Sequence, residues 1–231
     1  MVYFLEKLIQ LVKRDPGYRV DKAISFRSVF VVVFERLLSF IFGFFYQIIR
    51  LRRPVILFKV PSARISHSHK LYLTGTVTIG AKVDIDCLSQ HGVKFGHNVS
   101  IPVGTYIRCT GVVSDIGVGL TIGDNSGLGH YNFINAQGGV TIGNNVIVGP
   151  YVSFLSENHN FDDVSSLIRE QGVSRAGIVI GDNVWIGANV TILDGVEIGE
   201  GTVIGAGSIV TKSIPRNSVA VGNPCRVIKS R

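Results

Sequence analysis

Cysteine, methionine and tryptophan are scarce in this chain of 231 residues, which has three Cys, one Met and one Trp. The cysteines, Cys87, Cys109 and Cys225, are odd in number and far apart. Neither a disulfide framework nor a CxxC metal site is therefore predicted. Free thiols without such a framework are typical of a reducing compartment, so we expect a cytoplasmic protein with buried, unreactive thiols.

Charged residues are also few, at 17%, and acidic residues are sparse in the N-terminal third. Residues 1–70 hold 13 Lys or Arg against four Asp or Glu, whereas residues 71–231 hold 10 against 12. The net charge of +7 thus originates in the N-terminal third. The remaining sequence has no basic stripe with stacking aromatic residues, so no nucleic-acid partner is predicted, and an anionic membrane surface is the better candidate.

Glycine, in contrast, is abundant, and 27 glycines suit a chain that turns often. Between Ile180 and Pro215 the sequence repeats every six residues, and aliphatic side chains share one phase: Ile180, Ile186, Ile192, Ile198, Ile204 and Val210. A helix would need a period near 3.6 residues, and an isolated strand keeps its alternation for only four to eight. Short strands that turn a corner every six residues explain the pattern, with Gly, Asn and Asp at the corners. The repeat predicts a β-solenoid.

These hexapeptides resemble those of the hexapeptide-repeat acyltransferases. The resemblance covers roughly residues 79–229 and is most specific in VWIGANVTILDGVEIGEGTVIGAGSIVTKSIP and the ending VGNPCRVIK. It points most closely to the coenzyme A-dependent O-acetyltransferases of sugars and bacterial polysaccharides, such as galactoside, maltose and exopolysaccharide acetyltransferases. It implies an all-β fold, a left-handed parallel β-helix of triangular section with three hexapeptides per coil, assembled as a homotrimer.

Two parts are expected along the chain. Residues 1–70 form a helical, apolar and basic extension, and residues 71–231 form the β-helix with about six coils. Within the extension, residues 1–14 predict a helix that is ended by an Asp-Pro-Gly sequence. Four breaks interrupt the six-residue frame, and we expect them to mark loops at corners of the coil.

The apolar segment 26–49 has three alternative interpretations. It is nearly long enough to span a bilayer, but Arg27, Glu35 and Arg36 interrupt it. A central charge costs about 2.5–3.5 kcal/mol on insertion, so a clean span is disfavoured. A basic cluster follows, namely Arg50, Arg52 and Arg53. We favour an in-plane or re-entrant anchor, peripheral at the inner face of the cell membrane, over a helix packed under the solenoid or a true span.

The largest break in the repeat is a predicted protruding loop over residues 155–179. A long loop in a compact repeat is commonly functional. It contains SENHNFDD, which resembles the catalytic segment of the family, and the matching residue is His159. A neutral imidazole can take the proton of an attacking hydroxyl near neutral pH. The alternative is a solvated loop histidine.

Other catalytic groups follow from the resemblance. The main-chain N–H of Ala188 would stabilise the oxyanion, and an asparagine one coil earlier, for which Asn132 is the nearest candidate, would place the acetyl group or the acceptor. Both residues have an alternative as ordinary corner residues. The group that orients His159 stays open between a neighbouring coil or subunit and three nearby carboxylates: Glu157, Asp162 and Asp163.

The resemblance also implies acetyl-CoA as co-substrate. Its pantetheine arm needs small residues beside a groove, and its phosphates need cations. The matching residues are Ala188, Ala206, Thr211, Lys212, Arg226 and Lys229. Trp185 either lines this groove or faces a neighbouring subunit. The alternative for the cations is a solvated surface charge. No metal site is expected, because the other histidines lack the spacing of a three-histidine zinc site: His67, His69, His91, His97 and His130.

The sequence thus predicts transfer of acetyl from acetyl-CoA to a hydroxyl of a sugar or lipid-linked glycan in surface-polysaccharide biosynthesis, with His159 as general base. Two alternatives remain. One is N-acetylation of an amino sugar, which also needs a base. The other is a non-catalytic, membrane-associated solenoid scaffold, which would tolerate loss of His159.

Overall fold

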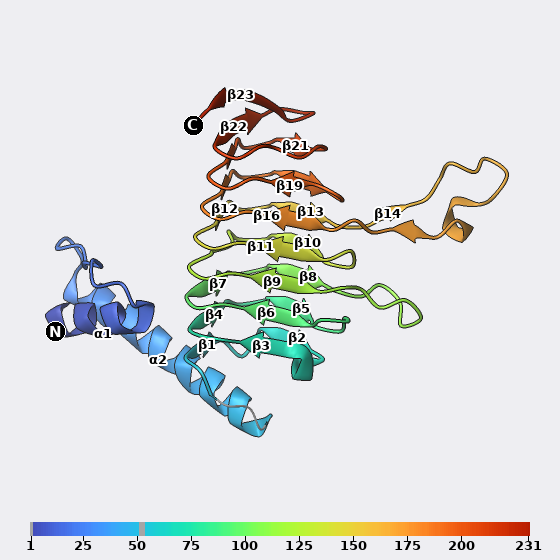
Figure 1. The fold of residues 1–231 in the computed structure, drawn as a ribbon. Helices are drawn as coiled ribbons and strands as arrows, with labels where there is room; N and C mark the ends of the chain where they lie inside the picture. Colours follow the sequence, from blue (N-terminus) through green and yellow to red (C-terminus); the bar gives the residue numbers. More distant parts are fainter. Residues whose placement is uncertain (1, 51–53) are drawn as a thin grey trace.

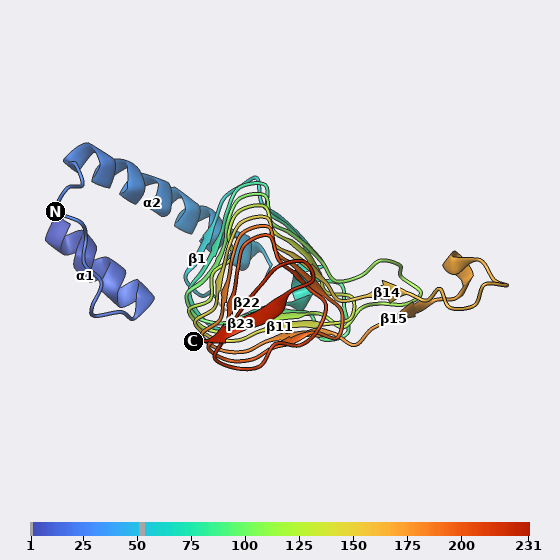
Figure 2. The same cartoon turned by 90° about the horizontal axis from the view of Figure 1, so that it is seen from above.

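The computed structural model describes residues 2–50 and 54–231. Two helices precede a stack of triangular coils (Figures 1 and 2). The helices are α1 (Val2–Lys13) and α2 (Phe26–Ile49), which confirms both predicted helical segments. α2 begins after Ser25, whose side chain accepts a hydrogen bond from the Ser28 N–H. Of the predicted basic cluster, Arg50 caps the end of α2, and Arg52 and Arg53 lie outside the described residues.

The coil has three faces, and on each face the strands of successive turns pair in parallel. The first face holds β2 (Arg64–Ser66), β5 (Asp84–Asp86), β8 (Tyr106–Arg108), β10 (Phe133–Asn135), β13 (Ser153–Leu155), β18 (Thr191–Leu193) and β21 (Ile209–Val210). The second holds β3 (Leu71–Leu73), β6 (Val93–Phe95), β9 (Leu120–Ile122), β11 (Val140–Ile142), β16 (Ile178–Ile180) and β19 (Glu197–Ile198).

The third face is joined across one coil by single bridges through Gly127. It holds β1 (Leu57–Lys59), β4 (Val77–Ile79), β7 (Val99–Ile101), β12 (Ile147–Val148), β17 (Trp185–Ile186), β20 (Val203–Ile204) and β22 (Ser218–Val221). β23 (Arg226–Ser230) pairs antiparallel with β22 and ends the stack. A parallel ladder pairs equivalent residues of successive coils, so the in-phase aliphatic residues form columns inside the triangle.

One such column runs through the first face. Ile134 pairs with Ile107 below it and Phe154 above it, and Phe154 pairs with Ile192. All four side chains are fully buried. Side chains alternate across a strand, so the residues on either side of each column point outward. The six-residue period is therefore explained by one inward aliphatic residue per strand.

The β-helix begins earlier than predicted, at Leu57 rather than near Leu71, and the first face has seven strands where about six coils were expected. The added first coil has no Gly-rich hexapeptide. Its inward positions include Lys59, whose Nζ donates to the carbonyls of Val60 and Ala63. Burial lowers the pKa of this lysine, and the nearby charge of Arg50 adds to the effect. An inward lysine breaks the apolar phase, which is why this coil was missed.

All four breaks in the six-residue frame lie at a single corner, the one between the first and second faces. We call it the loop corner. This corner carries a loop in the first coil, at residues 67–70, and the four loops that break the frame, at residues 87–92, 109–119, 136–139 and 156–177. The last of these is an arm that projects far from the stack, whereas the other two corners stay tight (Figures 1 and 2).

Candidate active site

The arm begins as a two-stranded ribbon that carries His159 at its root. β14 (Asn158–His159) pairs antiparallel with β15 (Val173–Ser174), and His159 lies opposite Val173. The His159 side chain is exposed. The ribbon continues the first face outward from the loop corner, so the imidazole stands beside the coil rather than inside it.

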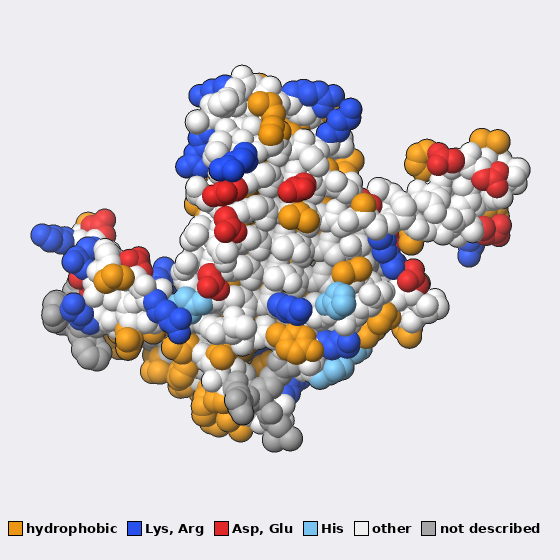
Figure 3. Space-filling model, viewed as in Figure 1, with side chains coloured by type: hydrophobic (Ala, Val, Ile, Leu, Met, Phe, Trp, Pro, Cys, Tyr) orange, Lys and Arg blue, Asp and Glu red, His pale blue; other side chains and the backbone are white. Residues whose placement is uncertain are grey.

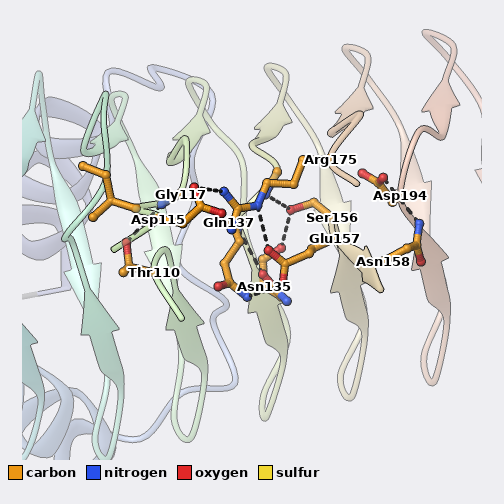
Figure 4. A network of polar contacts seen from close by, with 12 residues as sticks. Thr110, Asp115, Gly117, Asn135, Gln137, Ser156, Glu157, Asn158, Arg175 and Asp194 are labelled. Atoms are coloured by element: carbon orange, nitrogen blue, oxygen red, sulfur yellow. Dashed lines mark hydrogen bonds and ion pairs between the residues drawn. The ribbon is translucent and has the colours of Figure 1, made fainter. Parts of the chain in front are cut away.

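A polar network fixes this root to the coil (Figure 4). The Arg175 guanidinium donates from Nε to Glu157 Oε2 at 2.7 Å and from Nη1 to Asp115 Oδ1 at 2.9 Å. Gln137 Nε2 donates to the other Glu157 oxygen at 3.1 Å. On the opposite side, Asp194 accepts hydrogen bonds from the backbone N–H groups of residues 176 and 177. The two coils before the arm and the one after it therefore hold its two strands.

The charge of Arg175 is maintained in this setting despite partial burial. Burial opposes the charged form, but hydrogen bonds and charge attraction from Glu157 and Asp115 outweigh it and raise the arginine pKa. The Arg175 and Glu157 side chains are only 17% and 12% exposed. Their pairing is consequently less screened by water than a surface ion pair.

None of the three nearby carboxylates orients the His159 ring within the described chain. Glu157 is engaged by Arg175 and Gln137, and Asp162 is exposed. Asp163 accepts hydrogen bonds from the hydroxyls of Ser165 and Ser166. These bonds lower its pKa to about 2. Asp163 thus stabilises the turn at the far end of the arm.

Ala188 lies at a different corner, between β17 and β18, where glycines let successive coils approach closely. A Cβ on Gly149 would lie 2.7 Å from Ala188 N, and a Cβ on Gly187 would lie 2.6 Å from Ala206 N. Gly207 N–H donates to the Ala188 carbonyl. The N–H of Ala188 itself has no acceptor within the described chain, so it can donate to a ligand.

Asn132 does not have the position that was predicted for it. Its side chain is only 1% exposed. Its Oδ1 accepts from Val152 N at 2.6 Å and its Nδ2 donates to the Gly129 carbonyl at 3.1 Å. The amide therefore joins two coils from inside the corner, and its corner-residue alternative describes this geometry. Asn132 lies two residues before Ile134, the place in the hexapeptide where Val184 and Val190 are also buried, so the phase of the repeat turns its side chain inward.

The residues matched to coenzyme A binding lie in the last coils, in two groups. Trp185, which is 55% exposed, and Ala206 belong to the Ala188 corner and the third face beside it. Thr211 and Lys212 are exposed at the loop corner, and Arg226 and Lys229 are exposed on β23. The structure thus brings Trp185, Ala188 and Ala206 together and leaves the cations around the C-terminal end of the stack.

His159 and Ala188 occupy adjacent coils but opposite ends of the first face. β18 lies between the two corners, and at about 3.3 Å per residue this face separates them by on the order of 15–20 Å. A thioester carbonyl needs a base and an oxyanion donor within about 3 Å of its reacting atoms. One copy of the chain therefore does not bring the His159 imidazole and the Ala188 N–H to the same carbonyl.

Sequence reasoning missed Arg175, Gln137 and Asp115 as parts of the site. Arg175 and Asp115 are 60 residues apart and meet only because the loops of successive coils share one corner. The available signal was the set of frame breaks: had they been assigned to one corner, a polar contact between their residues could have been expected.

Comparisons with known proteins agree with this architecture. The bacterial transferase hexapeptide (six repeats) family matches residues 177–212. Galactoside O-acetyltransferase of Escherichia coli is 52% identical over 91 residues, 39% of this chain and 43% of its own length. A probable acetyltransferase of Mycobacterium tuberculosis is 37% identical over 112 residues, 48% of this chain and 37% of its own length. The chain thus spans less than half the length of these two relatives.

Among solved structures, a variant of AntD, an N-acyltransferase from Bacillus cereus in complex with dTDP and coenzyme A, superposes with a TM-score of 0.52 at 20% identity. The superposition covers 73% of this chain and 83% of AntD. At this identity the likeness shows the fold alone, which is the left-handed parallel β-helix. The repeat, the coil and the matched relatives together show that the β-helix of this chain is similar to those of hexapeptide-repeat acetyltransferases, with the family model itself matching residues 177–212.

Proposed function

We propose that the protein is an acetyl-CoA-dependent O-acetyltransferase that acts on a hydroxyl of a sugar or glycan. The observation that carries this proposal is the anchored arm, which holds His159 exposed beside the C-terminal hexapeptides that match the family. A scaffold would need neither an exposed histidine on a braced ribbon nor a corner of Gly and Ala residues in the next coil. The similarity to galactoside O-acetyltransferase supports a sugar acceptor.

In the proposed reaction, His159 acts as general base. Its neutral imidazole takes the proton of the acceptor hydroxyl as the oxygen attacks the thioester carbonyl. The N–H of Ala188 donates to the oxyanion of the tetrahedral intermediate. When the carbon–sulfur bond breaks, the proton passes from the imidazolium to the coenzyme A sulfur. The acceptor leaves as its acetyl ester, and no covalent enzyme intermediate is needed.

Coenzyme A would lie along the Ala188 corner. Ala188, Ala206 and the open space around Gly207, where an added Cβ would meet nothing within 4 Å, leave room for the narrow pantetheine arm. Trp185 offers an exposed ring beside it. The cations Lys212, Arg226 and Lys229 would meet the phosphates, and Thr211 would add a hydroxyl donor.

A homotrimer completes the site in this proposal. Because the base and the oxyanion donor lie at different corners of the triangle, each site takes its arm from one copy and its Ala188 corner from the next. A heterologous contact of this kind closes into a ring when the rotation between copies allows it. Three triangular coils around one axis provide three equivalent sites.

The acceptor is proposed to be a sugar or a lipid-linked glycan precursor of surface polysaccharide, met in the cytoplasm at the inner face of the cell membrane. His130 is exposed at the Ala188 corner, two coils below Ala188. That position suits a contact with the acceptor rather than with coenzyme A.

The test is the rate of coenzyme A release from acetyl-CoA with a panel of sugars and a lipid-linked glycan extract. Release should depend on the acceptor and fall at least about 100-fold in His159→Ala. His91→Ala is the matched control, because His91 is an exposed histidine of the same corner three coils away, and it should retain full activity. Equal release by His159→Ala and the unchanged protein would refute the general-base role. Mass and hydrolysis analysis of the product distinguishes an ester from the amide of an N-acetylated amino sugar.

A further inference from the structure

α2 turns its polar side toward the β-helix, whereas an ordinary surface helix turns its apolar side toward its own domain. Its buried residues are Val29, Ser39, Gly43 and Gln47, of which the last three recur every four positions and face the β-helix. A Cβ on Gly43 would lie 1.9 Å from the Leu57 carbonyl oxygen, so the helix backbone rests directly on β1. Gln47 accepts from Val55 N at 3.0 Å and donates to Val55 O at 3.2 Å. The helix is therefore held by its small and polar side, whereas a surface helix normally buries its apolar side.

Most of the remaining circumference of α2 is apolar and exposed, and its charged residues are Arg27, Glu35 and Arg36. At 100° per residue the large side chains form one continuous arc, and their exposed fractions range from 38% to 75%: Phe26, Phe30, Phe34, Leu37, Ile41, Phe44, Phe45, Ile48 and Ile49. Figure 3 shows hydrophobic side chains gathered at this end of the molecule. An 18-residue window of α2 has a mean hydropathy of 2.0. Monomeric soluble proteins rarely leave so large an apolar surface uncovered.

Basic side chains border this arc. The segment that precedes α2 carries five cations among its described side chains against three carboxylates, Glu6, Asp15 and Asp21, and Arg19 lies 3.5 Å from Glu6. The cations are Lys7, Lys13, Arg14, Arg19 and Lys22. Figure 3 shows Lys and Arg clustered around this segment. An apolar arc next to a row of cations matches the acyl chains and phosphates of an anionic lipid surface. A protein partner would instead be expected to present acidic side chains around an apolar groove.

We propose that α2 lies in the plane of an anionic membrane leaflet, with its apolar arc in the acyl region and the β-helix standing on its polar side. Glu35 and Arg36 argue against a span, because they would lie at its centre. Arg36 is also tied to the β-helix: Nη1 donates to Thr78 Oγ1 at 3.3 Å, and the guanidinium lies 5.3 Å from the Phe58 ring centroid. A spanning α2 would have to carry this contact and β1 into the hydrocarbon.

This orientation sets the height of the site above the lipid. The arm leaves the fifth coil, and with strands about 4.8 Å apart His159 lies roughly 19 Å above the first coil. The next step rests on the proposed function: a lipid-linked acceptor would have to present its hydroxyl at this height. The membrane contact itself does not depend on the reaction.

Flotation of the full chain with vesicles tests the proposal. Vesicles of phosphatidylcholine with about one third phosphatidylglycerol should carry the protein. Replacing Phe30 and Phe34 by Ser should weaken binding at least about tenfold per residue, from the loss of buried aromatic area. Phe161→Ser is the matched control, since Phe161 is 67% exposed on the arm, far from α2, and it should bind as the unchanged chain does. Neutralising Arg14 and Arg19 should weaken binding about fivefold per charge on these vesicles and not on pure phosphatidylcholine.

Two further outcomes are decisive. Flotation that is unaffected by the Phe30 and Phe34 changes would overturn the proposal. So would a smaller oligomer in sedimentation of that variant without vesicles, because a second copy would then cover the arc. Depth is read from Phe34→Trp in a Trp185→Phe chain: lipids brominated near the carbonyl should quench this tryptophan more than lipids brominated near the chain end. The reverse order would indicate a span.

Discussion

The ion pair between Arg175 and Glu157 provides the sharpest energetic prediction about the arm. In Arg175→Met the side chain keeps much of its length, but Glu157 loses its 2.7 Å partner. The carboxylate then keeps Gln137 Nε2 as its side-chain donor. Asp115, the second partner of the arginine, is 56% exposed and stays hydrated when the arginine is removed.

The expected free-energy cost of Arg175→Met follows from how little of the Arg175 and Glu157 side chains is exposed. Removing one partner of a fully buried pair costs about 3–5 kcal/mol, whereas exposed pairs contribute about 0.2–1 kcal/mol. Glu157 and Arg175 are 12% and 17% exposed, so we expect about 2–3 kcal/mol for Arg175→Met, nearer the buried limit. Asp115→Asn should cost at most about 1 kcal/mol. Since the arm is peripheral, the loss should appear as local opening of the ribbon rather than as unfolding of the coil.

Hydrogen exchange of the β14 and β15 amides measures this opening. Arg175→Met should accelerate their exchange about 30- to 150-fold, and Asp115→Asn less than about sixfold. Adding Glu157→Gln to Arg175→Met should recover part of the protection, because a neutral amide is cheaper to leave without an ionic partner. Equal effects of the Arg175 and Asp115 variants, or unchanged exchange in Arg175→Met, would refute the reasoning from burial.

Two other predictions concern the helix contact and the far end of the arm. Gly43→Leu should lift α2 from β1, because the added side chain would clash with the Leu57 backbone, 1.9 Å from the Cβ position. The two hydrogen bonds between Gln47 and Val55, about 1 kcal/mol each, would then be lost. Faster hydrogen exchange of the Val55 amide would measure this loss. The pKa of Asp163 is lowered to about 2, so its stabilising effect is complete above about pH 4 and is lost as pH falls through 2. Protection of the arm turn should therefore decline between pH 4 and 2 in the unchanged chain, and Asp163→Asn should abolish that dependence.

The sequence could predict most of the coil because each hexapeptide carries its own inward aliphatic residue. Ile180, Ile186 and Ile192 are all buried in phase, as predicted. The sequence did not predict the first coil because its inward residue is Lys59. This lysine is stabilised by the carbonyls of Val60 and Ala63, which approach it only in the folded corner. Local periodicity thus predicts a coil wherever the inward residue is apolar, and fails where a polar side chain is satisfied by the backbone.

The candidate site was less accessible from the sequence. His159 could be singled out by the frame break and by resemblance, whereas Asn132, chosen by resemblance, occupies an inward place of the hexapeptide and points into the corner. The pairing of Arg175 with Asp115 depends on which loops share a corner, and a single chain sequence does not contain that information. The sequence also does not show which group orients the His159 imidazole, since the proposed site is shared between copies.

The most direct measurement mixes two inactive chains. His159→Ala removes the base and Ala188→Asp blocks the oxyanion corner, so each alone should be inactive toward acetyl-CoA and its acceptor. If each site takes its arm from one copy and its Ala188 corner from the next, co-refolded equal amounts should recover about one quarter of the unchanged activity, because each position in a heterologous contact is filled by the suitable chain half of the time. Mixed oligomers that form but show no recovered activity would contradict a site shared between copies.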